Sequence, residues 1–254
     1  MDFCDKVVVV TGASSGIGAA TAKYFARESA NVVLIGRNEN ALNEIAAECE
    51  KAKGIKPLII KAELSNDDEV KNIVTKTIEV FGRIDVLVNN AGYGGKAGIL
   101  DGIEPYDHIM KTNVRAVYLL TSLCTPHLVK TKGNIVNVSS VAAFRPIKDL
   151  HFLPYCISKA ALDQFTRCLA VELAKYGIRV NSVNPGATRT NFVLAAGLSK
   201  EKAEELYKVR DKVMPLGKVA ESEDIADMIV FLASNRARSI TGAIHVIDNG
   251  ENLV

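Results

Sequence analysis

Short apolar runs of strand length recur along the chain, and longer helical patterns separate them. The runs lie at 7–10, 31–35, 57–60, 85–88, 134–138, 178–183 and 243–247. Most are rich in valine and isoleucine and do not alternate with polar residues, which is typical of parallel strands that are buried on both faces. Helical patterns fill the stretches between them, at about 17–29, 38–53, 67–81, 103–130, 155–176 and 222–233.

This alternation of strands and helices predicts an α/β fold. We expect a doubly wound parallel β-sheet, a Rossmann fold, of about seven strands with helices on both faces. No linker-like segment divides residues 1–254, so we expect a single domain. The alternation breaks at about 188–217, where one or two helices precede the last helix and strand. We expect that segment to be a lid over a substrate site.

The composition narrows the classes of function. The chain has 254 residues, of which 48% are hydrophobic and 24% charged, and its net charge of +2 gives no basic pattern for nucleic acid. No run approaches the roughly 18 apolar residues of a membrane span. The five cysteines and four histidines are scattered without a C-x-x-C pair, so neither a disulfide framework nor a metal site is predicted. We expect a cytoplasmic protein that binds neither nucleic acid nor a membrane.

A glycine-rich turn, TGASSGIG at 11–18, connects the first predicted strand to the first helix. Glycines at 12, 16 and 18 permit a tight turn and let the backbone approach a pyrophosphate, to which the helix N-terminus offers unpaired N–H groups. The spacing is T-G-x-x-x-G-x-G, and the lysine of a nucleotide-hydrolysing P-loop is missing. The turn therefore indicates a dinucleotide site.

The end of the second predicted strand bears on the choice of cofactor. An acidic residue near this position binds the ribose hydroxyls of NAD, but here Gly36 and Arg37 follow the strand. A guanidinium would bind the 2′-phosphate of NADP, whereas a carboxylate would repel it. We favour NADP. The alternative is that Arg37 is a surface residue and Glu39 binds the ribose of NAD.

Tyr155 and Lys159 stand four residues apart near the start of an otherwise apolar predicted helix, so they share one helical face. A cation about 5 Å from a phenol, at an effective dielectric constant near 20, contributes about 3 kcal/mol. This would lower the tyrosine pKa by about 2 and let the phenol exchange protons near neutral pH. The alternative is an interface tyrosine beside a solvated lysine.

Six motifs follow one another along the chain: TGASSGIG at 11–18, NNAG at 89–92, the asparagine of KTNV at 113, VSS at 138–140, YCISK at 155–159 and NPG at 184–186. In these motifs and their order the chain resembles the short-chain dehydrogenase/reductase superfamily, over nearly its whole length. The length of 254 residues matches the compact subtype of that superfamily.

The resemblance implies a role for each residue that matches a motif. Tyr155 would be the general acid or base, and Lys159 would lower its pKa and bind the nicotinamide ribose. Ser140 would bind the substrate oxygen, and Asn113 would help hold Lys159 and a water in a proton relay. The residues implied for the cofactor are Gly12, Ser14, Ser15, Gly16, Ile17, Gly18, Arg37, Asn38, Glu63, Leu64, Asn90, Ala91, Gly92, Tyr155, Lys159, Pro185, Gly186, Thr188 and Thr190.

The hypothesis for function follows from these roles. We predict an NADPH-dependent oxidoreductase that reduces a ketone or aldehyde of a hydrophobic substrate to an alcohol by hydride transfer. The alternatives are an NAD-dependent alcohol dehydrogenase of the same superfamily and a non-catalytic dinucleotide-binding regulatory module.

Apolar side chains near the predicted site suggest what the substrate is. The gap of 15 residues from Ser140 to Tyr155 is slightly longer than is usual in the superfamily. The predicted walls of the substrate cleft are Phe144, Leu150, His151 and Phe152 on one side and Phe192, Val193 and Leu194 on the other. Among these, Phe144, Phe152 and Phe192 are our candidate substrate contacts, together with Ser140 and Tyr155. This apolar set predicts a bulky hydrophobic carbonyl compound.

Two predicted helices, 103–130 and 155–176, carry apolar residues on more than one face. Only one face of each helix is needed to cover the sheet, so the surplus predicts a helix–helix contact between subunits of a homodimer or homotetramer. The residues of this surplus are Leu119, Leu120, Leu123, Leu162, Phe165 and Leu169.

Overall fold

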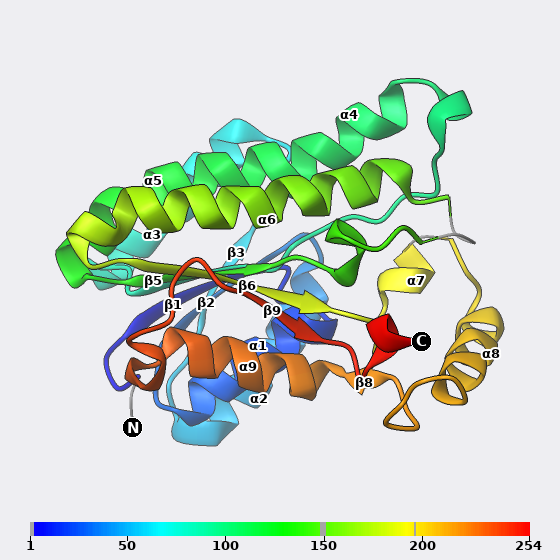
Figure 1. Ribbon diagram of the computed structural model, residues 1–254. Helices are drawn as coiled ribbons and strands as arrows, with labels where there is room; N and C mark the ends of the chain where they lie inside the picture. The colour runs from blue at the N-terminus through cyan, green and yellow to red at the C-terminus, as the bar shows by residue number, and fades with distance from the viewer. Residues whose placement is uncertain (1–2, 148–150, 196) are drawn as a thin grey trace.

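The structure is a computed structural model that describes residues 3–147, 151–195 and 197–254. Within these residues seven parallel strands form one sheet, in the order β3-β2-β1-β4-β5-β6-β9 (Figure 1). The strands are β1 (Val7–Thr11), β2 (Asn31–Gly36), β3 (Leu58–Lys61), β4 (Val86–Asn89), β5 (Asn134–Val138), β6 (Arg179–Pro185) and β9 (Ile244–Ile247). The predicted Rossmann-type sheet is confirmed, with each predicted run at its place.

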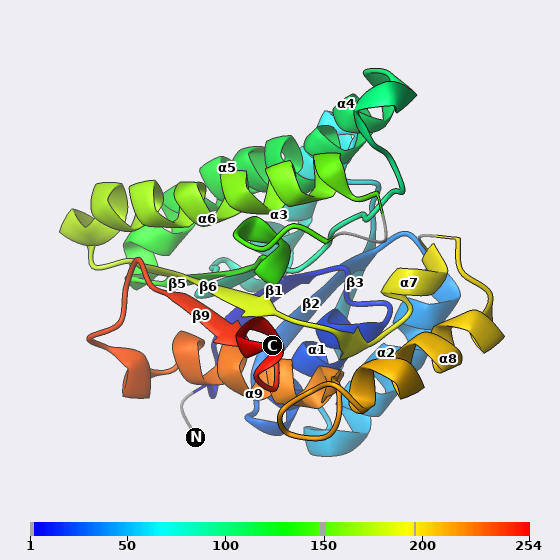
Figure 2. The same cartoon turned by 45° about the vertical axis from the view of Figure 1, so that its right-hand side comes forward.

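Helices cover both faces of the sheet. One face is covered by α1 (Gly16–Arg27), α2 (Glu39–Lys53) and α9 (Ser222–Ala233), and the other by α3 (Asp67–Phe81), α5 (Ala116–Thr131) and α6 (Leu153–Leu173). Figure 1 shows the two layers below and above the strands, and Figure 2 shows the same separation after a turn of the view.

The strand β1 explains why the apolar runs do not alternate. Val8 and Val10 pack into the core under α1 and α9, while Val7 and Val9 pack into the core under α3 and α5. Successive side chains of a strand point to opposite faces, and here both faces are covered. All positions of β1 are therefore buried, and all are apolar except Thr11 at its end.

The helix predicted at 103–130 is divided in two. A short helix α4 (Glu104–Met110) leads through a π-helical turn (Lys111–Arg115) into α5. Such π-bulges are frequent at functional sites, and this one contains Asn113.

The segment that breaks the alternation contains α7 (Phe192–Ala195) and α8 (Lys200–Asp211). The strands β7 (Thr188–Arg189) and β8 (Ala220–Glu221), which flank this segment, pair with each other in a separate two-stranded sheet. Short 3₁₀ turns include η1 (Ile99–Asp101), η3 (Val141–Ala143) and η6 (Glu251–Leu253). In the described parts of the chain, no helix combines the length and apolar character needed to cross a bilayer.

Candidate active site

A cleft of about 570 Å³ opens at the carboxyl ends of the strands. Its lining begins at the turn after β1 and includes the residues that follow β2, β4, β5 and β6. The chain leaves β1 toward β2 on one side, while β4 lies on the other side, so the strand order reverses at this point. Ligands of open parallel sheets bind at such a switch point.

The glycine-rich turn forms one end of the cleft. Gly12 and Gly16 have φ of 66° and 54°, left-handed values that favour glycine. Gly18 does not line the cleft; a Cβ there would lie 2.3 Å from the carbonyl oxygen of Gly12, so only glycine lets α1 pack against the turn. Ser14, Ser15 and Ile17, three of the predicted cofactor contacts, line the cleft.

The ends of β1 and β4 are tied together beside this turn. The Asn90 side-chain amide donates to the carbonyl of Thr11 at 2.8 Å, and the Asn90 backbone N–H donates to Thr11 Oγ1 at 2.9 Å. Asn90, Ala91 and Gly92 all line the cleft. The sequence separation is about 80 residues, so these bonds fix the floor of the cleft across the switch point.

Arg37 and Glu63 face each other at the end of the cleft beyond β2 and β3. Arg37 Nη1 lies 3.3 Å from Glu63 Oε2, and the arginine side chain is 73% exposed. Partial burial alone would raise the pKa of Glu63, but hydrogen bonds from Ser65 and the charge of Arg37 lower it overall. The Glu63 carboxylate is therefore held ionised beside the guanidinium. Leu64 lines the same end.

Asn38 does not line the cleft, contrary to the prediction. Its side chain is the N-cap of α2 and accepts a hydrogen bond from the Ala41 N–H at 3.1 Å. Asparagine is strongly preferred at this position because it satisfies an otherwise unpaired N–H of the first turn. The residue next to Arg37 thus stabilises a helix end.

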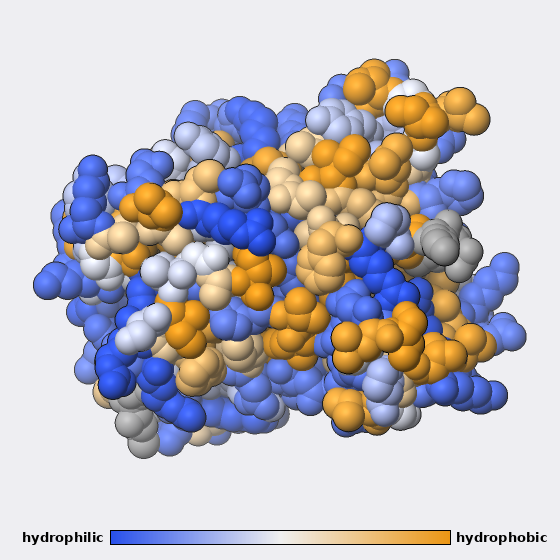
Figure 3. All heavy atoms as spheres, viewed as in Figure 1, coloured by the Kyte–Doolittle hydropathy of each residue, from blue (hydrophilic) through white to orange (hydrophobic). Residues whose placement is uncertain are grey.

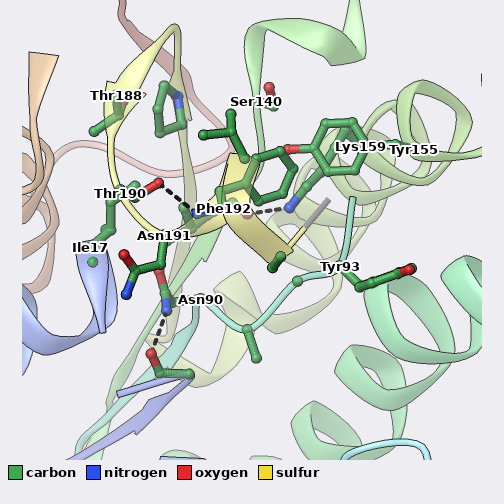
Figure 4. A pocket seen from close by; sticks show the side chains of 18 of the residues that line it. Ile17, Asn90, Tyr93, Ser140, Tyr155, Lys159, Thr188, Thr190, Asn191 and Phe192 are labelled. Carbon is green, nitrogen blue, oxygen red and sulfur yellow. Dashed lines mark hydrogen bonds between the residues drawn. The ribbon is translucent and has the colours of Figure 1, made fainter. Parts of the chain in front are cut away.

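Ser140, Tyr155 and Lys159 converge in the middle of the cleft (Figure 4), and all three are buried. Ser140 lies two residues beyond the end of β5 and is the N-cap of η3, where its Oγ accepts a hydrogen bond from the Ala142 N–H at 3.1 Å. Lys159 Nζ donates to the carbonyl of Val138 at 2.8 Å and lies 5.5 Å from the centroid of the Tyr155 ring. The helical neighbours predicted from the sequence do share one face.

The predicted lowering of the tyrosine pKa is absent from this structure. Burial raises the pKa of Tyr155 to about 12, although a hydrogen bond with Ser140 acts to lower it. Burial also lowers the pKa of Lys159 to about 8, against the opposing effect of the Asp163 charge. Removal from water disfavours the charged form of each group, and burial is the largest cause of both shifts.

Asn113 lies behind the cleft wall rather than on it. Its side chain bonds both backbone groups of Tyr93, accepting from the N–H at 2.8 Å and donating to the carbonyl at 2.9 Å. It also donates to Ser158 Oγ at 3.0 Å. A Cβ at Gly92 would meet Lys159 Nζ at 3.4 Å and Asn113 Oδ1 at 3.7 Å, so the two groups flank the same glycine. Asn113 thus fixes the backbone beside Lys159.

Aromatic rings surround Tyr155 at the substrate end. The Phe192 ring centroid is 5.3 Å from that of Tyr155, and the Phe152 centroid is 5.7 Å from it. Both phenylalanines and Val193 line the cleft, as do Pro185, Gly186, Thr188 and Thr190.

Other predicted wall residues do not line the cleft. Phe144, a candidate substrate contact, is 54% exposed and lies outside the lining of the cleft. Leu194 packs beside the small core of α8, and His151 is exposed. Leu150 falls outside the described residues.

Several lining residues were not predicted. Tyr93 and His108 form an edge-to-face pair, with centroids 5.0 Å apart, on one wall. Arg145, Arg210 and Glu251 line the substrate end although they are far apart in sequence. The long segment between Ser140 and Tyr155 could have pointed to Arg145 as a cleft residue. No sequence motif marks Arg210 or Glu251 as residues of the cleft. Among the described residues, no group of three or more His, Cys, Asp or Glu side chains is arranged to hold a metal ion.

Comparison with known proteins gives a consistent result. The family described as Enoyl-(Acyl carrier protein) reductase matches residues 12–252. An uncharacterized oxidoreductase of Thermotoga maritima is 39% identical over 100% of both chains. Glucose 1-dehydrogenase of Gluconobacter oxydans is 38% identical over 99% of this chain and 93% of its own. A short-chain dehydrogenase/reductase of unknown function from Caenorhabditis elegans, crystallised with cofactor, has a TM-score of 0.95 and 40% identity, covering 100% of this chain and 97% of its own.

Proposed function

Since the chain belongs to the short-chain dehydrogenase/reductase superfamily, whose members are oxidoreductases that bind a nicotinamide dinucleotide, we propose that it is an NADPH-dependent carbonyl reductase. Its substrate is a ketone or aldehyde carried on a bulky hydrophobic compound. The observation that carries this proposal is the convergence of Ser140, Tyr155 and Lys159 in one buried part of a cleft that also contains the glycine-rich turn.

The residues of the cleft fit a nicotinamide dinucleotide. The glycine-rich turn offers backbone N–H groups at the start of α1 to a pyrophosphate. Asn90, Ala91 and Gly92 border the adenosine half, and Pro185, Gly186, Thr188 and Thr190 border the nicotinamide half. When bound, the reduced cofactor supplies the hydride.

The chain itself handles the proton and the carbonyl oxygen. Ser140 Oγ and the Tyr155 hydroxyl hydrogen-bond the substrate oxygen, and Tyr155 gives its proton to that oxygen as negative charge develops there. Lys159, held by the Val138 carbonyl, stabilises the phenolate that remains. Asn113 supports this arrangement by fixing the Tyr93 backbone beside Lys159.

Arg37 supports NADPH as the cofactor. Its largely exposed guanidinium lines the adenosine end and is free to turn toward a 2′-phosphate, with which it would form charge-assisted hydrogen bonds. Glu63 favours the alternative, an NAD-dependent alcohol dehydrogenase, because its ionised carboxylate competes for the same guanidinium. Kinetics with the two cofactors decide between these possibilities.

The substrate proposal rests on the side chains around Tyr155. Phe152, Phe192, Ile147, Val193 and Leu206 give this end of the cleft an apolar surface. Apolar surface that closes on a ligand contributes about 25 cal/mol per Å² of buried area, so a large hydrophobic carbonyl compound gains most from it.

The test is turnover of a panel of ketones and aldehydes, followed by NADPH absorbance, with native protein and Tyr155→Phe. We expect turnover of bulky apolar carbonyl compounds by the native protein. We expect the variant to fold, bind cofactor and lose nearly all activity. A phenylalanine variant that keeps more than about a tenth of the native rate contradicts the role of Tyr155, since general acid catalysis contributes a factor of about 100 or more.

We also propose a homodimer or homotetramer that associates through α5 and α6. Leu120 and Leu162, which the sequence suggested for this contact, are buried inside the chain itself. Exposed apolar residues of α5 and α6 include Tyr118, Ile157 and Val171. The ring centroids of Tyr118 and Phe165 are 5.7 Å apart. Figure 3 shows apolar side chains over the face formed by these helices.

A further inference from the structure

The C-terminal turn η6 lies at the same end of the sheet as α7 and α8 (Figures 1 and 2). Its first residue, Glu251, lines the cleft, and the Glu251 side chain is 12% exposed. One carboxylate oxygen, Oε2, accepts a hydrogen bond from the Ala187 N–H at 2.7 Å. The other, Oε1, accepts from Arg210 Nη1 of α8. A single carboxylate therefore joins the turn after β6 to the helix that covers the substrate end.

Glycine at 186 makes this contact possible. A Cβ there would lie 2.6 Å from Glu251 Oε2, closer than a real Cβ approaches an oxygen atom. The turn Pro185–Gly186–Ala187 is thus shaped around the Glu251 carboxylate, and Gly186 and Ala187 also line the cleft. The contact therefore fixes backbone that a ligand in the cleft would touch.

The C-terminal turn η6 is also held by hydrogen bonds from Arg145, on another wall of the cleft. Arg145 Nη1 donates to the carbonyl of Glu251, and Arg145 Nη2 donates to the carbonyl of Val254 at 3.1 Å. Arg145 belongs to the segment that follows Ser140, so three walls of the cleft meet at this turn. Glu251 cannot shift without moving at least two of them.

From this geometry we infer that Glu251 is a positioning residue for the nicotinamide half of the cofactor site. It holds the Pro185–Gly186–Ala187 turn at the place where the carboxamide binds, and it latches α8 to that turn through Arg210. The inference rests on the proposed function, because it takes the cleft to bind a nicotinamide dinucleotide.

The position of Glu251 separates this role from general stabilisation. The adenosine half of the site is built around Arg37 and Glu63, which follow β2 and β3, at the other end of the cleft. Loss of the Glu251 carboxylate leaves the half-buried Ala187 N–H or the half-buried Arg210 guanidinium without its acceptor, and a lost charge-assisted hydrogen bond no longer fixes the turn. The loss should therefore weaken the binding of a whole dinucleotide and spare a ligand that has only the adenosine half.

The experiment compares NADP⁺ with adenosine 2′,5′-bisphosphate by calorimetry, in native protein, Glu251→Gln and Arg210→Met. Glutamine offers one acceptor oxygen and one NH₂, so it can serve only one of the two donors. We expect each variant to raise the Kd of NADP⁺ about tenfold or more and to leave the Kd of the bisphosphate within about twofold, as loss of one charge-assisted contact predicts. In the double variant Glu251→Gln/Arg210→Met, the two losses of NADP⁺ binding free energy should not add, because the two side chains contact each other.

Glu204→Gln is the matched control. Glu204 is on α8, like Arg210, and its carboxylate lies 3.4 Å from the guanidinium of Arg189, but it does not line the cleft. We expect both affinities of this variant to equal those of native protein. Equal weakening of both ligands in Glu251→Gln, or no weakening of NADP⁺, overturns the inference and leaves the proposed function standing. Should Glu251→Gln fail to fold, Arg210→Met decides by the same comparison. A native protein that binds neither NADP⁺ nor NAD⁺ overturns both.

Discussion

The Phe192 ring lies directly against Gly94. A Cβ built on Gly94 would be 2.1 Å from Phe192 Cζ, with two further ring carbons within 2.9 Å. The other side of the ring neighbours Tyr155, and Figure 4 shows the two rings side by side in the cleft. The start of α7 therefore packs against Tyr155, and this packing requires glycine at position 94, in the segment that follows β4.

This contact predicts the effect of Gly94→Ala. The added methyl group must displace Phe192, and overpacking of this kind costs about 1–3 kcal/mol of unfolding free energy. Phe192→Ala removes the obstacle, so the double variant should lose less than the sum of the single variants in urea unfolding. Gly98→Ala is the control, since its nearest neighbours lie at 3.7 Å or beyond. Additive losses would show that the two residues do not touch.

Lys159→Met should raise stability while it abolishes turnover. The pKa of Lys159 is lowered from 10.5 to about 8 by burial, so the unfolded chain binds its proton more tightly than the folded one. Burial of the charged lysine therefore lowers the free energy of unfolding of the native protein by at most about 3 kcal/mol. This destabilisation is fully present below pH 8 and disappears as the pH rises toward 10.5. Urea unfolding at pH 7 should show the variant more stable than native protein, and this gap should narrow by pH 10. Lys175→Met, which removes an exposed lysine, is the control; a gap that does not change with pH contradicts the burial argument.

Arg37 and Glu63 should act in opposite directions on cofactor choice. Arg37→Gln removes the cation proposed for the 2′-phosphate, and we expect the KM for NADPH to rise at least about tenfold with little change for NADH. Glu63→Gln removes the competing carboxylate, which lies 3.3 Å from the guanidinium, and should lower the KM for NADPH. Steady-state kinetics with both cofactors measure these effects. Native protein that uses NADH and NADPH equally well would refute the assignment.

A charge placed on the face of α5 and α6 should dissociate the proposed oligomer. Val171 is 81% exposed on α6, and burial of an unpaired carboxylate at a subunit contact is strongly unfavourable. We expect Val171→Asp to sediment as a monomer at a concentration where native protein is a dimer or tetramer. Val209→Asp, at an exposed valine of α8, is the matched control and should leave the assembly intact. A monomeric native protein would rule out this contact altogether.

The sequence determined the architecture because its patterns are local. The non-alternating runs report burial on both faces, and all seven became strands of the parallel sheet. The glycines at 12 and 16 predicted a tight turn between the first strand and the first helix, and both adopt left-handed φ values, 66° and 54°, in that turn. The spacing of Tyr155 and Lys159 predicted that they share one face of α6, because residues i and i+4 of any helix are neighbours on its surface.

The tertiary structure decided what depends on surroundings from distant parts of the chain. Spacing gave the distance between Tyr155 and Lys159 but not the burial that raises one pKa and lowers the other. Phe144 and Phe152 look alike in the sequence, yet only Phe152 faces the cleft, because backbone bonds with Ala97 hold the start of α6 there. Glu251 meets Ala187 and Arg210 only because β6, α8 and η6 end at one edge of the sheet. Contacts between residues that are far apart in sequence leave no periodic trace, so such groups emerge only when the chain has folded.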